Sequence, residues 1–118
     1  PLSPEQKDIE FAAAAWGGSF LRHLFPLLYT KLVRPGRLDL STLVGSLTSG
    51  PAQILGLKQA GTLKPGTPAD ITVINLDATA TISASTLPTQ ERNTPFLHEE
   101  VTGLPVLTMV AGKTFTLS

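Results

Sequence analysis

The stretch that decides the fold is ILGLKQAGTLKPGTPADITVINLD, residues 54–77. It begins at the end of a helical apolar pattern, passes through a segment rich in Gly and Pro, and ends in the apolar run 71–75, which is typical of a strand. Within it, Lys64-Pro65-Gly66 is typical of a turn with proline at its second position and glycine at a positive φ. The chain is therefore predicted to change from helices to strands near residue 60.

Helices are expected before this change. Ser3-Pro4-Glu5 is typical of a helix start, and Gly17-Gly18 of a helix end. A later apolar stripe with intervals of three and four predicts a second helix, which Pro26 should kink or restart. The expected helices cover residues 4–15, 19–33, 40–48 and 51–55.

Strands are expected after the change, because the sequence becomes rich in Thr, Val and Ile with Gly and Pro between the runs. The last two are joined by Ala111-Gly112, a connection short enough for a hairpin. Residues 83–100 show little periodicity and are predicted to form an ordered loop. A sheet of so few strands is only marginally stable by itself, and we therefore expect these strands to belong to a larger sheet. The expected strands cover residues 71–75, 80–82, 105–110 and 113–117.

Composition excludes several classes of protein. The 118 residues include 42% hydrophobic side chains, nine basic and nine acidic residues, and no cysteine. This balance favours a globular chain with a moderate core and gives no basic patch for nucleic acid. No apolar run approaches the roughly 20 residues needed to span a bilayer. We therefore expect a cytoplasmic protein without nucleic-acid or membrane partners. Because the chain starts with Pro1 and not with Met, we expect it either to be processed or to be cut from a longer protein.

The residue types that carry chemistry are sparse. His23 and His98 are the only histidines, and neither has a second histidine at metal-ligand spacing. We interpret His23 as a surface or interface residue and His98 as part of a solvated loop, although Glu99-Glu100 could complete a metal shell beside it. Gly17-Gly18-Ser19 could bind an anion at a helix start, but a plain turn is the commoner role. None of these makes a self-sufficient active site.

Three groups of segments, taken together, resemble dihydroorotases. The first is similar to the region after the last barrel strand, the second to the last barrel helices, and the third to the small C-terminal domain. The block Arg92-Asn93-Thr94-Pro95-Phe96 narrows the resemblance from amidohydrolases in general towards dihydroorotase, with allantoinase close behind. The three groups are 7–11 with 16–17 and 25–30; 40–43 with 51–57; and 61–63 with 68–71, 92–97 and 112–113.

The resemblance implies an α/β fold: residues 1–58 would be the C-terminal helices of a metal-dependent hydrolase TIM barrel, and residues 59–118 part of an accessory β-sandwich. It implies a zinc enzyme that interconverts dihydroorotate and N-carbamoyl-aspartate in pyrimidine synthesis. The family's ligands are a His-x-His pair, a carboxylated lysine, two more histidines, and an aspartate in an Asp-His-Ala-Pro motif. Pro1 corresponds to the proline of that motif. We therefore expect this chain alone to bind no zinc and to be inactive.

Two substrate contacts of the family map onto this chain. Trp16-Gly17 corresponds to a pair whose backbone holds the pyrimidine, and Leu2 to a contact that is often histidine. Leu2 cannot donate a hydrogen bond, while Phe20 and Arg22 replace a small residue and a glutamate. These departures suggest divergent specificity or lost activity.

The alternatives to a dihydroorotase are a non-catalytic assembly subunit, for example one that supports a transcarbamoylase, and an allantoinase or hydantoinase. We expect a homo-oligomer, or the missing N-terminal part of the same chain, to cover exposed apolar surface.

Overall fold

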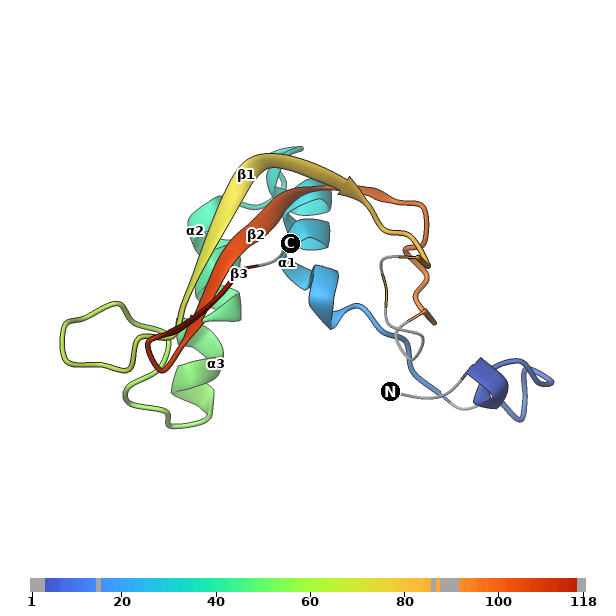
Figure 1. Cartoon of the computed structure of the whole chain (residues 1–118), viewed down its shortest axis with the longest axis horizontal. Helices are drawn as coiled ribbons and strands as arrows, with labels where there is room; N and C mark the ends of the chain where they lie inside the picture. The colour runs from blue at the N-terminus through green and yellow to red at the C-terminus, as the bar shows by residue number, and fades with distance from the viewer. Residues whose placement is uncertain (1–3, 15, 86, 88–91, 117–118) are drawn as a thin grey trace.

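The structure is a computed structural model that describes residues 4–14, 16–85, 87 and 92–116. A long bent antiparallel sheet arches over the helices, and the N-terminal segment extends away from it at one end (Figure 1). The elements in chain order are a 3-10 turn Pro4–Gln6, a 3-10 turn Leu21–His23, α1 Leu24–Leu28, a π-helical turn Tyr29–Val33, α2 Leu40–Leu47, α3 Ser49–Ile54, β1 Ile71–Thr81, β2 Glu100–Val110 and β3 Lys113–Thr116.

The helix predicted over 4–15 is wrong for the residues described. Only Pro4–Gln6 forms a short 3-10 turn, and turns and bends occupy most of the chain from there to Ala14. The side chain of Phe11 is 97% exposed, so no apolar face is buried along this segment. A short helix without tertiary packing is marginal in water, which explains why the pattern alone did not suffice. Ser3 and Ala15 lie outside the described residues.

The helix predicted over 19–33 is a continuous helical segment that starts at Leu21 and changes type along its length. The predicted restart near Pro26 is the change from 3-10 to α-helix at Leu24. Pro26 then lies in the first turn of α1, where a backbone N–H has no intrahelical partner and its absence costs little. Pro26 and Leu27 are buried, so this short helix presents its apolar side to the core.

The two shorter helices are confirmed. α2 begins after Asp39, whose side chain accepts the Thr42 backbone N–H at 2.9 Å and so caps the helix. The pKa of the Asp39 carboxyl is held well below its usual range by the hydrogen bonds that it accepts. The Ser41 hydroxyl has the largest effect, followed by the Thr42 hydroxyl and the Thr42 backbone N–H. α3 begins at Ser49 rather than at Pro51, which occupies its first turn.

The sheet has the order β1-β2-β3, with both neighbouring pairs antiparallel. The strands predicted over 71–75 and 80–82 are one strand, β1, which is interrupted by a register shift between Asn75 and Thr79. Asn75 pairs with Leu104 and Thr79 with Thr102, so the segment between them bulges opposite Gly103. Bulges of this kind bend and twist a sheet, and here the bulge accompanies the arch.

The strand predicted over 105–110 starts earlier, at Glu100. The prediction missed its first half because that half carries glutamate and glycine, which are weak strand signals. The hairpin at Ala111-Gly112 is confirmed: both residues have positive φ, 48° and 79°, as a type I′ turn requires. The turn at Lys64-Pro65-Gly66 is also confirmed, with the Thr67 N–H donating to the Lys64 carbonyl at 3.2 Å and Gly66 at φ 89°.

The core lies where α1 meets β2, the residue that follows β1, and Leu87 of the loop 83–100. Leu27, Ile82, Leu87 and Val101 form a buried cluster, and Val101 is 0% exposed. The loop closes at its base, since the Ile82 N–H donates to the Glu99 carbonyl at 3.0 Å. Among its described residues the loop contains no helix, and no strand before Glu100, as predicted.

Polar contacts fix the helical segment to β2. The Thr102 backbone N–H donates to the Thr30 hydroxyl at 2.8 Å, and the Arg34 guanidinium donates to the Thr102 hydroxyl at 3.0 Å. Thr102 is buried, so these bonds satisfy groups that would otherwise lose their water without replacement. Next to them, the ring of Tyr29 packs below Gly103.

Candidate functional site

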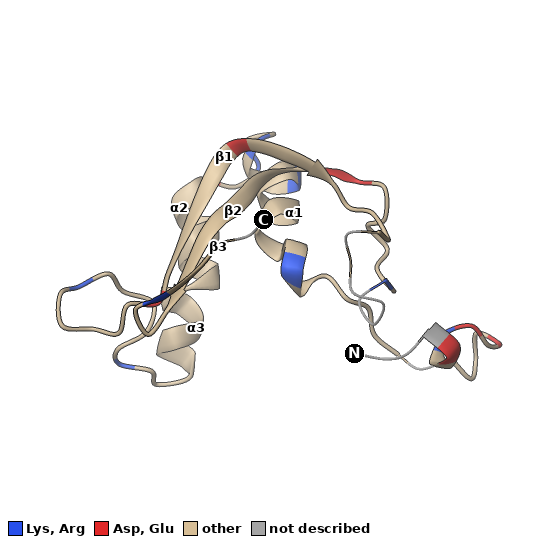
Figure 2. Ribbon diagram, in the orientation of Figure 1, with Lys and Arg blue, Asp and Glu red and all other residues tan. Residues whose placement is uncertain are grey.

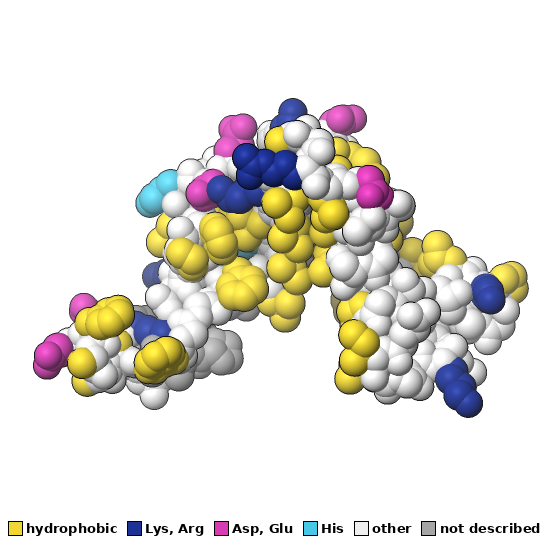
Figure 3. Space-filling model, turned by 180° about the vertical axis from the view of Figure 1, so that it is seen from behind, with side chains coloured by type: hydrophobic (Ala, Val, Ile, Leu, Met, Phe, Trp, Pro, Cys, Tyr) yellow, Lys and Arg dark blue, Asp and Glu magenta, His cyan; other side chains and the backbone are white. Residues whose placement is uncertain are grey.

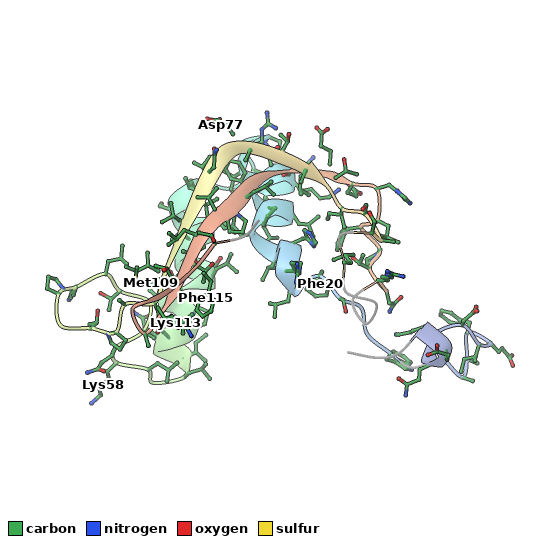
Figure 4. All side chains as sticks on the ribbon, viewed as in Figure 1. Phe20, Lys58, Asp77, Met109, Lys113 and Phe115 are labelled. Carbon is green, nitrogen blue, oxygen red and sulfur yellow. The ribbon has the colours of Figure 1, made fainter. Side chains whose placement is uncertain are left out.

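The candidate site is the loop 16–19, which precedes the helical segment leading to α1. Trp16 is 95% exposed, and Gly17 has a φ of 114°, a conformation that residues with a side chain rarely adopt. Figure 4 shows Phe20 at the start of that helical segment, on the side of the arch away from α3. The loop therefore presents an aromatic side chain and bare backbone to the surroundings.

A second segment, far away in the sequence, holds this loop. The Asn93 side-chain amide donates to the Gly17 carbonyl at 2.9 Å, and the Asn93 carbonyl accepts the Ser19 N–H at 2.8 Å. A Cβ placed on Gly18 would lie 3.4 Å from the Asn93 carbonyl oxygen, so the two backbones are in close contact. The Lys7 ammonium donates to the same Gly17 carbonyl.

These contacts decide which backbone groups remain for a ligand. The Gly17 carbonyl has two lone pairs and already accepts from Asn93 and Lys7. A ligand contact by Gly17 would therefore use its N–H. The Ser19 N–H is engaged by Asn93, and the helix after it is a 3-10 turn of three residues. The plain-turn interpretation of Gly17-Gly18-Ser19 is thus favoured over an anion site.

The remaining predicted residues surround this loop or lie outside the description. Phe20 and Arg22 follow it directly and are exposed. Leu2 lies outside the described residues, so its role stays a prediction, as does that of Trp16-Gly17. In the sequence, Asn93 is only part of a family signature, and no local signal indicates that its side chain donates to the Gly17 carbonyl.

Neither histidine belongs to a metal site within the described part of the chain. His23 is half-buried on the 3-10 turn Leu21–His23, and His98 is exposed on a loop with a φ of 68°. Glu99, which could have joined His98, instead forms an ion pair with Lys31 at 2.9 Å. The described residues contain no group of three His, Cys, Asp or Glu side chains able to hold a metal ion. They therefore do not fit the zinc that the resemblance implies.

Among the residues that the structure describes, the charged side chains form no local concentration. Lysine, arginine, aspartate and glutamate are scattered along the ribbon, with both signs represented at the ends and in the middle (Figure 2). In the described residues, no helix is both long and apolar enough to span a bilayer. The described part of the site is therefore defined by the backbone groups of the loop and by the exposed Trp16 side chain.

Comparison with known proteins supports the resemblance found in the sequence. The chain is 43% identical over 114 residues to a dihydroorotase of Shouchella clausii, a match that covers 97% of this chain and 26% of that protein. Among solved structures, a D-hydantoinase of Thermus sp. is 30% identical, with a TM-score of 0.86 over 97% of this chain and 26% of its own. A dihydropyrimidinase of Brevibacillus agri is 25% identical, with a TM-score of 0.89 over 98% of this chain and 26% of its own.

The chain thus spans about a quarter of the length of these relatives. The predicted resemblance to dihydroorotases is confirmed by relatives of that name, and the solved neighbours are named hydantoinase and dihydropyrimidinase. The strongest single result is a family match over residues 17–115, which includes Gly17, all three α-helices, β1, β2 and all of β3 except its last residue. The chain belongs to the amidohydrolase family.

Proposed function

We propose that this chain is part of a dihydroorotase, which hydrolyses the ring amide of dihydroorotate to N-carbamoyl-aspartate and catalyses the reverse ring closure. The observation that carries this proposal is the match to a protein named dihydroorotase over 97% of the chain. In the hydrolytic direction the oxygen of water ends on the carbonyl carbon, the ring C–N bond breaks, and the nitrogen gains a proton.

The loop 16–19 would supply substrate binding. A dihydropyrimidine ring carries carbonyl oxygens that accept hydrogen bonds, and the N–H of Gly17 is the backbone group that its contacts with Asn93 and Lys7 leave available. The exposed indole of Trp16 offers a flat apolar surface next to it. Together they would hold one edge of the ring and cover part of its face.

A zinc ion would supply the activated hydroxide in the whole protein, as the resemblance implies. Because the described residues do not fit a zinc site, the contribution of this chain is restricted to binding and orientation. The expectation that the chain alone lacks bound metal and turnover is part of this proposal. Zinc content and dihydroorotate turnover of the isolated 118-residue chain test it, and stoichiometric zinc or measurable turnover would contradict it.

We further propose that residues 1–58 belong to a barrel and 59–118 to an accessory sandwich of the whole protein. The order of elements supports this division, with helices up to Ile54 and strands from Ile71. Apolar side chains gather in the hollow of the arch and at its ends (Figure 3), and Leu21 and Ile54 are among the most exposed. Surfaces of this kind fit burial against the rest of the same protein or a second copy.

A hydantoinase-type activity is the second candidate, favoured by the fold likeness to the Thermus and Brevibacillus enzymes. It involves the same kind of ring opening on a different ring. Parallel assays of the whole protein with dihydroorotate, dihydrouracil, hydantoin and allantoin separate the candidates. The proposal expects the highest kcat/KM with dihydroorotate. Preference for another ring would contradict it, and absence of all turnover together with co-purification of a transcarbamoylase would favour the assembly subunit.

A further inference from the structure

Asn93 stands out because one residue joins the candidate substrate loop to the folded core. Asn93 makes two hydrogen bonds to the loop: its side-chain amide donates to the Gly17 carbonyl, and its main-chain carbonyl accepts the Ser19 N–H. The two partners lie on either side of Gly18, which has no side chain and contacts the Asn93 backbone. The loop is thus held across its middle by a single residue.

The support behind Asn93 is firm. The Thr94 N–H donates to the Arg92 carbonyl at 3.0 Å, and the Phe96 N–H donates to the Thr94 hydroxyl at 3.3 Å, so the block is locally folded. Phe96 and Leu97 then pack against the buried cluster around Val101. Through these contacts the position of Asn93 is fixed relative to the core.

The loop itself has little else to fix it. Trp16, Gly17 and Gly18 are exposed, and no helix forms in the described residues before them apart from Pro4–Gln6. The other recorded hydrogen bond to Gly17 within the described chain comes from Lys7, a long side chain on the same irregular segment. A lysine side chain loses much rotamer freedom on ordering, so it holds a loop less well than a short amide on a packed segment.

We infer that Asn93 is a positioning residue that holds Trp16-Gly17 in the conformation that contacts the ring of a cyclic amide substrate. The inference rests on the proposed function, since it assigns Asn93 a part in that same site. Asn93 does not touch substrate; it acts by engaging the Gly17 carbonyl and so directing the Gly17 N–H outward. A short side-chain amide is required, because aspartate has the same shape but no donor and would place its charge against the Gly17 carbonyl.

The test compares Asn93→Asp with Asn75→Asp in the whole protein. Asn75 is a matched control, because it is also exposed and its side chain only accepts the Asp77 N–H at 3.0 Å, which aspartate can still do. For Asn93→Asp we expect KM for dihydroorotate to rise about tenfold, the scale of one lost hydrogen bond, with kcat changed by less than about twofold. Hydrogen exchange over 17–19 should become faster at the Ser19 amide, which donates to the Asn93 carbonyl. The control should leave KM and exchange unchanged, and zinc content should be the same in both.

The outcomes separate the inference from the proposed function. Unchanged exchange at 17–19 in Asn93→Asp would overturn the inference, as would faster exchange with unchanged KM, since the contact would then be purely structural. Equal loss in Asn93→Asp and Asn75→Asp would also overturn it. Failure of the wild-type protein to turn over any of the cyclic amides would refute the proposed function instead, and the exchange comparison would still decide whether Asn93 holds the loop.

Discussion

Replacing Gly103 by alanine tests why the sheet bends where it does. Gly103 is buried in β2 with a φ of 86°, opposite the bulge of β1. A Cβ at this position would lie 2.8 Å from Cδ1 and 3.3 Å from Cγ of Tyr29, and 3.4 Å from Cε1 of Phe25. The Tyr29 ring cannot move freely, because it stacks on Phe25 with centroids 5.9 Å apart and planes 9° apart. Either the stack or the strand must therefore shift.

The expected magnitude has two parts. The positive φ costs an alanine about 1–2 kcal/mol, and the extra methyl group in a packed site costs about 1–3 kcal/mol more. Gly36→Ala is the control, because Gly36 has a φ of 74° but a Cβ there would meet nothing within 4 Å. We expect Gly103→Ala to destabilise the protein by about 2–5 kcal/mol and Gly36→Ala by about 1–2 kcal/mol.

Urea unfolding of the whole protein and both variants measures this difference. Adding Tyr29→Leu to Gly103→Ala should recover part of the loss, since the leucine leaves space for the methyl group, and the two changes should be less than additive. Equal destabilisation by Gly103→Ala and Gly36→Ala, within about 0.5 kcal/mol, would refute the steric argument. Strict additivity with Tyr29→Leu would show that the contact with Tyr29 is not its source.

Other predictions concern polar and apolar contacts of the helices. Thr30→Val leaves the buried Thr102 N–H without its acceptor and should cost about 1–3 kcal/mol in urea unfolding, whereas Thr30→Ser should cost much less. Leu43 is 1% exposed, so Leu43→Ala should cost about 2–5 kcal/mol, against under about 1 kcal/mol for Val44→Ala on the exposed side of the same helix. The depressed pKa of Asp39 means that its charge stabilises α2 fully above about pH 4 and progressively less as the pH falls through the folded-state pKa. The stability gap between wild type and Asp39→Ala should therefore shrink in acid, and a gap that does not depend on pH would contradict the capping role.

Local signals predicted much of this fold. The turn at Lys64-Pro65-Gly66 followed from residue types that favour particular φ values, and the hairpin at Ala111-Gly112 followed from the shortness of the connection. The helix over 40–48 followed from helical apolar spacing before residue 60, and the structure adds the Asp39 side chain as its N-cap. In each of these the determining interaction lies within a few residues, so the sequence contains it directly.

Features that depend on distant partners were predicted less well. The expected helix over 4–15 had suitable residues but nothing to pack against in the described chain, and it is absent. β1 was divided into two runs because its middle, around Asp77, carries the polar residues of a bulge whose partner is Gly103. Glu100 begins β2 only because Thr81 lies opposite it.

The candidate site shows the same limit. The family resemblance supplied Trp16-Gly17, but nothing near them in the sequence indicated that Asn93 would hold them in place. That contact joins positions 76 residues apart, and it depends on the folding of the whole segment between them. The role of the block 92–96 can thus be inferred only once the fold places Asn93 beside the loop.

The most direct test of the central claim is the conversion of dihydroorotate by the whole protein. The conversion is monitored through the loss of ring absorbance, and the product is then identified. We expect N-carbamoyl-aspartate to form, and to form with a higher kcat/KM than the products of dihydrouracil, hydantoin or allantoin. Hydrolysis of one of those rings in preference to dihydroorotate would contradict the account, and so would a protein with a full complement of zinc that opens none of them.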